Sequence, residues 1–153
     1  MRCRLSILGV LTSVFCIISC EDNYYIENDL HGMWQVTSVE KITGGESTEY
    51  SGLLYYSFQR NIVMLSFNHS NAPENMTRYI APFELIGIDS MGVGEFRYYT
   101  TGEGDYVNQE LQVPLDSLIK FGICQPYTSF QMKLSKHKLI LTSDSACIVL
   151  RKY

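Results

Sequence analysis

Hydrophobic and polar residues alternate along most of the chain after residue 30. A repeat of two places alternate side chains on opposite faces of a strand, and the 3.6-residue repeat of a long helix is absent. The pattern therefore predicts an all-β domain. We expect strands at 33–41, 53–58, 61–67, 78–88, 93–100, 106–113, 130–134, 138–142 and 146–152.

Short segments rich in glycine and small polar residues separate these strands, at 44–45, 59–61, 68–77, 90–92, 102–105, 135–137 and 143–145. Such residues favour tight turns, so the order of elements is that of consecutive antiparallel hairpins. One segment, 114–122, differs: Pro114 opens it, Asp116 follows in its first turn and Gly122 closes it. These are helix start and stop signals, and they predict one short helix before the last strands.

Eight or nine strands in a domain of about 120 residues suit a closed barrel, which has no sheet edges, as well as they suit a β-sandwich. Periodicity alone leaves both alternatives open. A single domain is expected, because no repeat, linker or second compositional block interrupts the chain.

The first nineteen residues have the order of parts of a secretory signal. Arg2 and Arg4 precede an apolar stretch, 5–18, that is shorter than the about 20 residues needed to span a bilayer. The sequence IISC at 17–20 resembles a bacterial lipobox, and this resemblance implies that Cys20 is acylated after cleavage before it. The alternative is an ordinary cysteine in an uncleaved apolar segment.

The two acidic residues behind this cysteine, Glu21 and Asp22, resemble the export signal of Bacteroidota lipoproteins displayed on the outer surface. The alternative is a solvated tether that faces the periplasm. We therefore expect a signal peptide at 1–19, a lipidated tether at 20–29 and the folded domain at 30–153. The expected location is the outer membrane, on its cell-surface or periplasmic side.

Charge and cysteine content restrict the class of binding partner and the possible disulfide bonds. Loss of residues 1–19 removes two of the twelve basic residues and leaves all sixteen acidic ones, so nucleic-acid binding is not expected. Cys124 and Cys147 are then the cysteines that remain besides Cys20. They could form a disulfide in an exported protein, or stay free as small apolar side chains.

A resemblance decides between barrel and sandwich. The sequence HGMW at 31–34 places Gly32 and Trp34 at the start of the first strand, and Arg151 lies near the end of the last. This pair is similar to the calycin signature of lipocalin-like domains, in which the arginine packs over the tryptophan and closes the barrel floor. Guanidinium over indole is a favourable cation–π contact, so both residues are interpreted as structural.

More broadly, the chain resembles small lipocalin-like lipoproteins of unknown function from Bacteroidota. The lipobox, the Gly-x-Trp start, the LYYSFQ segment at 54–59 and the ending KLIL at 138–141 with RKY at 151–153 carry this resemblance. It implies a lipocalin-like antiparallel barrel of eight to nine strands with one short helix. A helix placed before the last strands, rather than after the barrel, departs from typical lipocalins.

Catalytic and metal-binding motifs are not apparent. No nucleophile elbow, zinc-protease motif, phosphate-binding loop or zinc-spaced cysteine pair occurs. The glycine pairs at 92–94 and 102–104 are interpreted as hairpin turns. We expect neither an enzyme nor a cofactor nor a metal site. The ionisable residues that could serve such sites are the histidines His31, His69 and His137 and the acids Glu84, Asp89, Glu95 and Glu110, and we expect them at strand ends, in loops or as outward-facing charges.

Tyrosines are the feature that could mark a binding surface. In the doublets Tyr55–Tyr56 and Tyr98–Tyr99, neighbouring side chains must point to opposite faces of a strand. Inward rings either line a pocket or fill the core, whereas outward rings suit contact with a protein or a glycan.

A short pattern, Asp-Ser followed by an apolar residue, occurs at Ser90, Ser117 and Ser145. It resembles the O-glycosylation acceptor of exported Bacteroidota proteins, and it is also common turn and cap chemistry. The whole sequence predicts a membrane-anchored, non-enzymatic binding module. Its partner would be a small apolar or amphipathic ligand in the barrel or, alternatively, an envelope protein or glycan on the outside of a filled barrel.

Overall fold

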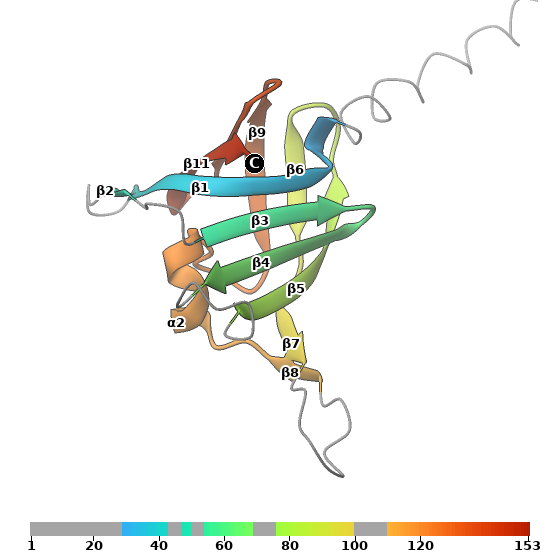
Figure 1. Ribbon diagram of the computed structural model, residues 1–153, viewed down its shortest axis with the longest axis vertical. Helices are drawn as coiled ribbons and strands as arrows, with labels where there is room; N and C mark the ends of the chain where they lie inside the picture. Colours follow the sequence, from blue (N-terminus) through green and yellow to red (C-terminus); the bar gives the residue numbers. More distant parts are fainter. Residues whose placement is uncertain (1–28, 43–46, 50–53, 69–75, 100–109) are drawn as a thin grey trace, which may run out of the picture.

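The computed structural model describes residues 29–42, 47–49, 54–68, 76–99 and 110–153 (Figure 1). The expected signal peptide, most of the tether, His69 and the turn at 102–105 lie outside these residues. The described chain forms an 11-stranded sheet and one short helical segment. Its elements are β1 (Gly32–Lys41), β2 (Ser47–Glu49), β3 (Leu54–Gln59), β4 (Ile62–Asn68), β5 (Met76–Leu85), β6 (Ser90–Val93), β7 (Arg97–Tyr99), β8 (Glu110–Gln112), α2 (Leu115–Leu118), η3 (Ile119–Phe121), β9 (Thr128–Leu134), β10 (Lys138–Thr142) and β11 (Ala146–Lys152).

Eight of the strands close into an antiparallel barrel. Around the barrel the order is β1, β3, β4, β5, β6, β9, β10 and β11, and β11 pairs again with β1. The strands β2, β7 and β8 lie off this ring, since β2 pairs with β1 and β7 pairs with β5 and β8. The predicted lipocalin-like barrel is therefore confirmed, and the sandwich alternative is wrong.

The limits of β1, β3, β4, β9, β10 and β11 are predicted to within two residues, whereas β2 was not predicted and the strand predicted at 93–100 is observed only as β7. Both β10 and β11 begin and end where predicted. The turn predicted at 90–92 is wrong, because Met91 is buried inside β6 and Gly92 lies opposite Ser129 of β9. The chain reverses earlier, at 86–89, where Gly87 has a φ of 85° that few other residues adopt.

Strand alternation fills the barrel. In β3 and β9 every second side chain is buried, and the inward side chains of the ring form one core. This is the expected consequence of a repeat of two in which one face is apolar. The largest fully buried side chains include Trp34, Tyr56, Phe58, Phe96, Phe121 and Phe130.

The barrel has two ends of different construction (Figure 1). At one, which we call the Trp34 end, β1 begins and β11 finishes, and the turns β3–β4, β5–β6 and β9–β10 lie beside them. At the other, the helical end, the segment α2–η3 packs against the starts of β3 and β11.

The predicted helix at 114–122 is confirmed as α2 followed by η3. It ends at Gly122, which has a φ of 80°. A Cβ at this position would lie 2.6 Å from Cγ1 of Ile148, so glycine is required both by backbone conformation and by close packing on β11. Among the described residues no helix is both long enough and apolar enough to cross a membrane.

Candidate functional site

The interior of the barrel is occupied by aromatic side chains that touch one another. The rings of Tyr56 and Phe58 stack with centroids 6.1 Å apart, and Phe58 meets the edge of Phe83 at 5.3 Å. From the helical end, Phe121 contacts Tyr56 at 6.2 Å and Tyr79 at 6.3 Å. Edge-to-face pairs at these distances are favourable core contacts. Among the described residues, the inward aromatic rings thus contact one another across the barrel interior.

The tyrosine doublet at 55–56 divides between the two faces as predicted. Tyr56 is fully buried, and its hydroxyl donates a hydrogen bond of 2.5 Å to the carbonyl of Phe121. Burial, with a smaller contribution from nearby Cys124, raises the pKa of Tyr56 far above its ordinary value. Tyr55 points outward, where its ring meets the edge of Tyr153 at 5.6 Å.

In the second doublet, Tyr98 is half-buried and its ring lies 6.4 Å from that of Tyr79. Tyr98 thus packs against the edge of the core and is not displayed on the surface. The side chain of Tyr99 lies outside the described part of the structure.

At the Trp34 end, a lysine closes the barrel over the tryptophan. Trp34 is fully buried, and its indole Nε1 donates a hydrogen bond of 2.7 Å to the carbonyl of Leu30. The Nζ atom of Lys152 lies 4.5 Å from the ring centroid and donates 2.7 Å hydrogen bonds to the carbonyls of Asp29 and His31. Burial lowers the pKa of Lys152, and Asp29 partly opposes this shift.

The expectation that Arg151 covers Trp34 is wrong. Arg151 is exposed, and its guanidinium donates a 2.8 Å hydrogen bond to Oε1 of Gln35. Its backbone pairs with Gln35, whereas Lys152 pairs with Trp34. Because Leu150 points inward, strand alternation directs Arg151 outward and Lys152 inward. Counting from Leu150 would have identified Lys152 in the sequence.

The helical end holds a second lysine over aromatic rings, which sequence reasoning missed. The Nζ atom of Lys120 lies 3.6 Å from the ring centroid of Phe67 and 5.5 Å from that of Phe121. Burial lowers the pKa of Lys120. No local signal marks this contact, because Phe67 and Lys120 are far apart in sequence and meet only when the helical segment packs on β4.

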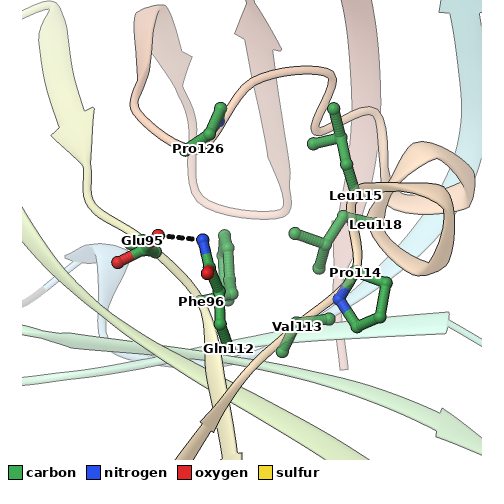
Figure 2. A pocket seen from close by; sticks show the side chains of 8 residues that line it. All are labelled: Glu95, Phe96, Gln112, Val113, Pro114, Leu115, Leu118 and Pro126. Atoms are coloured by element: carbon green, nitrogen blue, oxygen red, sulfur yellow. Dashed lines mark hydrogen bonds between the residues drawn. The ribbon is translucent and has the colours of Figure 1, made fainter.

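Beside the helical segment lies a small hollow of about 340 Å³, which we call the α2 hollow (Figure 2). Phe96 and Leu118 form part of its apolar wall, and Glu95 and Gln112 contribute a polar rim where the Gln112 amide donates to the Glu95 carboxylate. Its lining residues are Glu95, Phe96, Gln112, Val113, Pro114, Leu115, Leu118 and Pro126.

A shallow groove of about 650 Å³ runs over the outside of β5 and β6, and we call it the Tyr127 groove. Tyr127 is 72% exposed at its edge, and Ile86 is 53% exposed. Gly92 and Gly94 in its floor lack side chains that would fill it. Its lining is formed by Asn61, Pro82, Phe83, Glu84, Ile86, Gly92, Val93, Gly94, Tyr127, Thr128 and Ser129.

Among the described residues, Cys124 and Cys147 are free thiols. The disulfide alternative for Cys124 and Cys147 is therefore not the state of this structure. Cys147 accepts a long contact of 3.8 Å from the Thr142 hydroxyl on the neighbouring strand, so its outward side chain is held within the sheet surface.

The three serines of the Asp-Ser pattern differ in setting. Ser90 begins β6 and its hydroxyl contacts Asp89, Ser117 lies within α2, and Ser145 lies in the β10–β11 turn. All three are half-buried. Their modification remains a prediction.

The ionisable residues considered for chemistry do not converge in the part of the chain that is described. No group of three or more histidine, cysteine or acidic side chains there could hold a metal ion. His31 accepts a hydrogen bond from the backbone amide of Arg60 at 3.1 Å, and His137 is exposed in the β9–β10 turn. Glu95 is engaged by Gln112.

Comparison with known proteins agrees with this geometry. A family model described as a lipocalin-like domain matches residues 14–153. The structure of a lipocalin-like protein from Bacteroides uniformis, 18% identical, gives a TM-score of 0.55 over 82% of this chain and 99% of that one. An uncharacterized protein from Bacteroides eggerthii, 14% identical, gives 0.57 over 81% and 99%. No curated protein matches the chain.

Lipocalin-like domains are generally non-enzymatic binding proteins, so the fold suggests a binding module. The structural likenesses are too distant in sequence to indicate more than the fold. The family match, in contrast, covers nearly the whole chain and includes both strands that close the ring. The chain belongs to the lipocalin-like domain family.

Proposed function

We propose that this protein is a non-enzymatic binding module of the cell envelope, held at the outer membrane by an acylated Cys20. Its contacts are made on the outside of the barrel, with an envelope protein or glycan, and not in the barrel interior. The observation that carries this proposal is the packed aromatic interior, in which Phe121 from the helical segment contacts both Tyr56 and Tyr79.

The closure of both ends supports an external contact surface. A ligand that entered from the helical end would have to displace Phe121, which is fully buried, and break the Tyr56 hydrogen bond to its carbonyl. One that entered from the Trp34 end would have to displace Lys152 from two carbonyls. Leaving the buried Tyr56 hydroxyl and Phe121 carbonyl unpaired is costly, and Lys152 would lose two hydrogen bonds and its contact with the Trp34 ring, so either route opposes binding.

The Tyr127 groove supplies the contact surface. It combines a largely exposed aromatic ring, an exposed isoleucine and a floor that contains two glycines. Aromatic residues that keep a polar tip in water are enriched in protein contacts, and an accessible backbone offers close approach. Ile62 and Pro82 extend the same apolar surface along β4 and β5.

Tryptophan fluorescence tests where ligands bind, because Trp34 is the one tryptophan of the chain and is fully buried. Titration of the protein with long-chain fatty acids should leave the Trp34 emission and the unfolding midpoint unchanged. Saturable quenching at one ligand per chain, together with a raised midpoint, would contradict a filled interior.

The anchor is tested separately by mass spectrometry of the mature N-terminus. We expect Cys20 as the first residue, carrying acyl chains, and we expect Cys20→Ala to abolish both the modification and the cleavage before residue 20. A mature protein with an unmodified Cys20 would contradict the anchor.

A second candidate function, binding of a small apolar ligand, is favoured by the α2 hollow. Its wall is apolar and its rim carries one carboxylate–amide pair, which is the usual composition of a small-molecule site (Figure 2). Leu118→Trp would fill the hollow. A ligand that binds the unchanged protein but not the Leu118→Trp variant would be assigned to this hollow.

A further inference from the structure

The Trp34 end of the barrel brings together basic side chains from several turns. Lys133 and Lys136 come from the end of β9 and the turn after it, and both are exposed. Neither side chain makes a hydrogen bond or an ion pair with any residue that the structure describes. Their ammonium groups are therefore available to a partner outside the domain.

These lysines line a groove of about 940 Å³ that reaches the N-terminal start of the domain. Asp29, the first described residue, forms one wall, and Ile88 of the β5–β6 turn forms another. The structure places the two turns next to the start of β1 (Figure 1, top). The groove is thus cationic and partly apolar, and it lies where the chain leads back to Cys20.

Apolar side chains project from the same end of the barrel. Ile88 is 63% exposed and Tyr153 is 77% exposed. Met33 is also exposed there. Basic residues interspersed with exposed isoleucine and tyrosine are typical of surfaces that rest in a lipid headgroup layer.

Basic side chains are concentrated at the Trp34 end, although the chain as a whole is acidic. At this end the basic residues are Arg60, Lys133, Lys136, Lys138, Arg151 and Lys152, and the acidic ones are Asp29, Glu84 and Asp89. Elsewhere, among the side chains that the structure describes, the basic residues are Lys41, Arg78, Arg97 and Lys120, and the acidic ones are Glu40, Glu95, Asp116 and Asp144.

We propose that the Trp34 end is a membrane-docking face, whose Lys133–Lys136 groove binds the phosphate-bearing headgroups of anionic lipids while Ile88 and Tyr153 enter the interface. This inference rests on the proposed anchor at Cys20. Eight residues separate Cys20 from Asp29, so the tether spans at most about 30 Å and keeps this end of the barrel close to the bilayer.

The orientation has a consequence for the proposed contact surface. With the Trp34 end on the lipid, the helical end and the α2 hollow face away from the membrane. The Tyr127 groove, on the side of the barrel, stays accessible to a partner in the same membrane.

Hydrogen exchange on vesicles tests the docking face. The full chain is purified from membranes with its anchor and reconstituted into phosphatidylcholine vesicles, or into an equal mixture of phosphatidylcholine and phosphatidylglycerol. We expect protection of amides in the β5–β6 and β9–β10 turns on the anionic vesicles alone, and its loss in high salt. Each basic side chain near an anionic surface strengthens binding roughly five-fold.

The test variant is Lys133→Glu with Lys136→Glu, and the docking constant should fall at least about 25-fold. The matched control, Lys41→Glu with Arg78→Glu, makes the same charge change at two exposed residues away from the docking face and should leave the protection unchanged. The buried Trp34 emission verifies that both variants are folded.

The outcomes separate the two proposals. Failure of the unchanged protein to float with either vesicle would contradict the anchor. Flotation without protection of the two turns, equal protection on neutral vesicles, or protection by soluble polyglutamate but not by vesicles, would overturn the docking face.

Discussion

Each end of the barrel places a lysine ammonium over an aromatic ring, yet the two lysines have different surroundings. Lys152 lies over Trp34 and also bonds two backbone carbonyls of the segment that leads into β1. The ammonium group of Lys120 contacts two aromatic rings, those of Phe67 and Phe121. The same residue type therefore acts as a hydrogen-bonded clasp at one end and as a cover over apolar rings at the other.

The difference shows how a small barrel can be closed in two ways. At the Trp34 end, closure depends on charge-assisted hydrogen bonds from Lys152 to one exposed and one part-buried carbonyl and on its contact with the Trp34 ring. At the helical end, closure depends on shape, because η3 can seat Phe121 in the core only if Gly122 turns without a side chain against β11. We expect substitutions at the two ends to separate these contributions.

The largest effect is expected from Gly122→Ala at the helical end. Its Cβ would meet Ile148 at 2.6 Å and its φ of 80° disfavours alanine, so the free energy of unfolding should fall by about 3 kcal/mol. Gly87→Ala is the matched control, since Gly87 has a φ of 85° but nothing within 4 Å of the added Cβ. It should lose about 1 kcal/mol. Urea unfolding measures both, and equal losses would show that close packing at Gly122 is unimportant.

Lys152→Met should come next, with a loss of about 2 kcal/mol, because two carbonyls lose their donor and the indole loses its cation. Arg151→Met on the exposed side of the same strand should cost less than about 0.5 kcal/mol. Urea unfolding followed by Trp34 emission measures both variants. A larger loss for Arg151→Met than for Lys152→Met would indicate that Arg151, and not Lys152, closes this end of the barrel.

Tyr56→Phe tests the polar contact inside the helical end, and should cost about 1 kcal/mol near neutral pH. Its pH dependence is more specific. Above pH 10 a tyrosine ionises in the unfolded chain, whereas buried Tyr56 keeps its proton because burial raises its pKa. The contribution of Tyr56 to the free energy of unfolding is thus fully present below pH 10, and it falls by about 1.4 kcal/mol per pH unit above pH 10.

Tyr56→Phe should remove this alkaline decline, and Tyr55→Phe on the outer face should retain it. Urea midpoints measured between pH 8 and pH 11 compare the three proteins. If the stability of Tyr56→Phe still declined above pH 10 as in the unchanged protein, the decline would arise from another ionisable group.

The smallest effect is expected from Lys120→Met, which keeps the aliphatic stem over Phe67 but removes the charge. The loss should be about 0.5 kcal/mol, as for a cation–π contact that has no hydrogen-bonded carbonyls to satisfy. If Lys120→Met cost as much as Lys152→Met in the same urea experiment, the distinction between the two ends would fail.

The fold was largely predictable because its signals are local. Alternation located the strands, turn residues located most of the loops, and Pro114 and Gly122 located the helix. The segment at 90–92 was predicted to be a turn because Ser90 and Gly92 are typical turn residues. It is a strand because tertiary packing buries Met91 between β5 and β9. Burial outweighs turn propensity there.

Much less of the candidate site was predictable. The filled interior depends on Phe121 reaching Tyr56 and Tyr79, and no pattern in the sequence brings these three residues together. The docking face likewise depends on which turns share an end of the barrel. The motif indicates Arg151 by residue type, whereas strand alternation directs the neighbouring Lys152 toward Trp34.

The seam between β1 and β11 also governs when the fold can form. The hydroxyl of Thr37 donates to the carbonyl of Val149 across 112 positions, and the amide of Tyr153 donates to the carbonyl of Met33. Contacts this distant in sequence raise the contact order and slow folding, because a long loop must close before they form. The ring cannot shut until β11 has been synthesised. If the protein is exported to the outer membrane, this delay favours an unfolded chain during export.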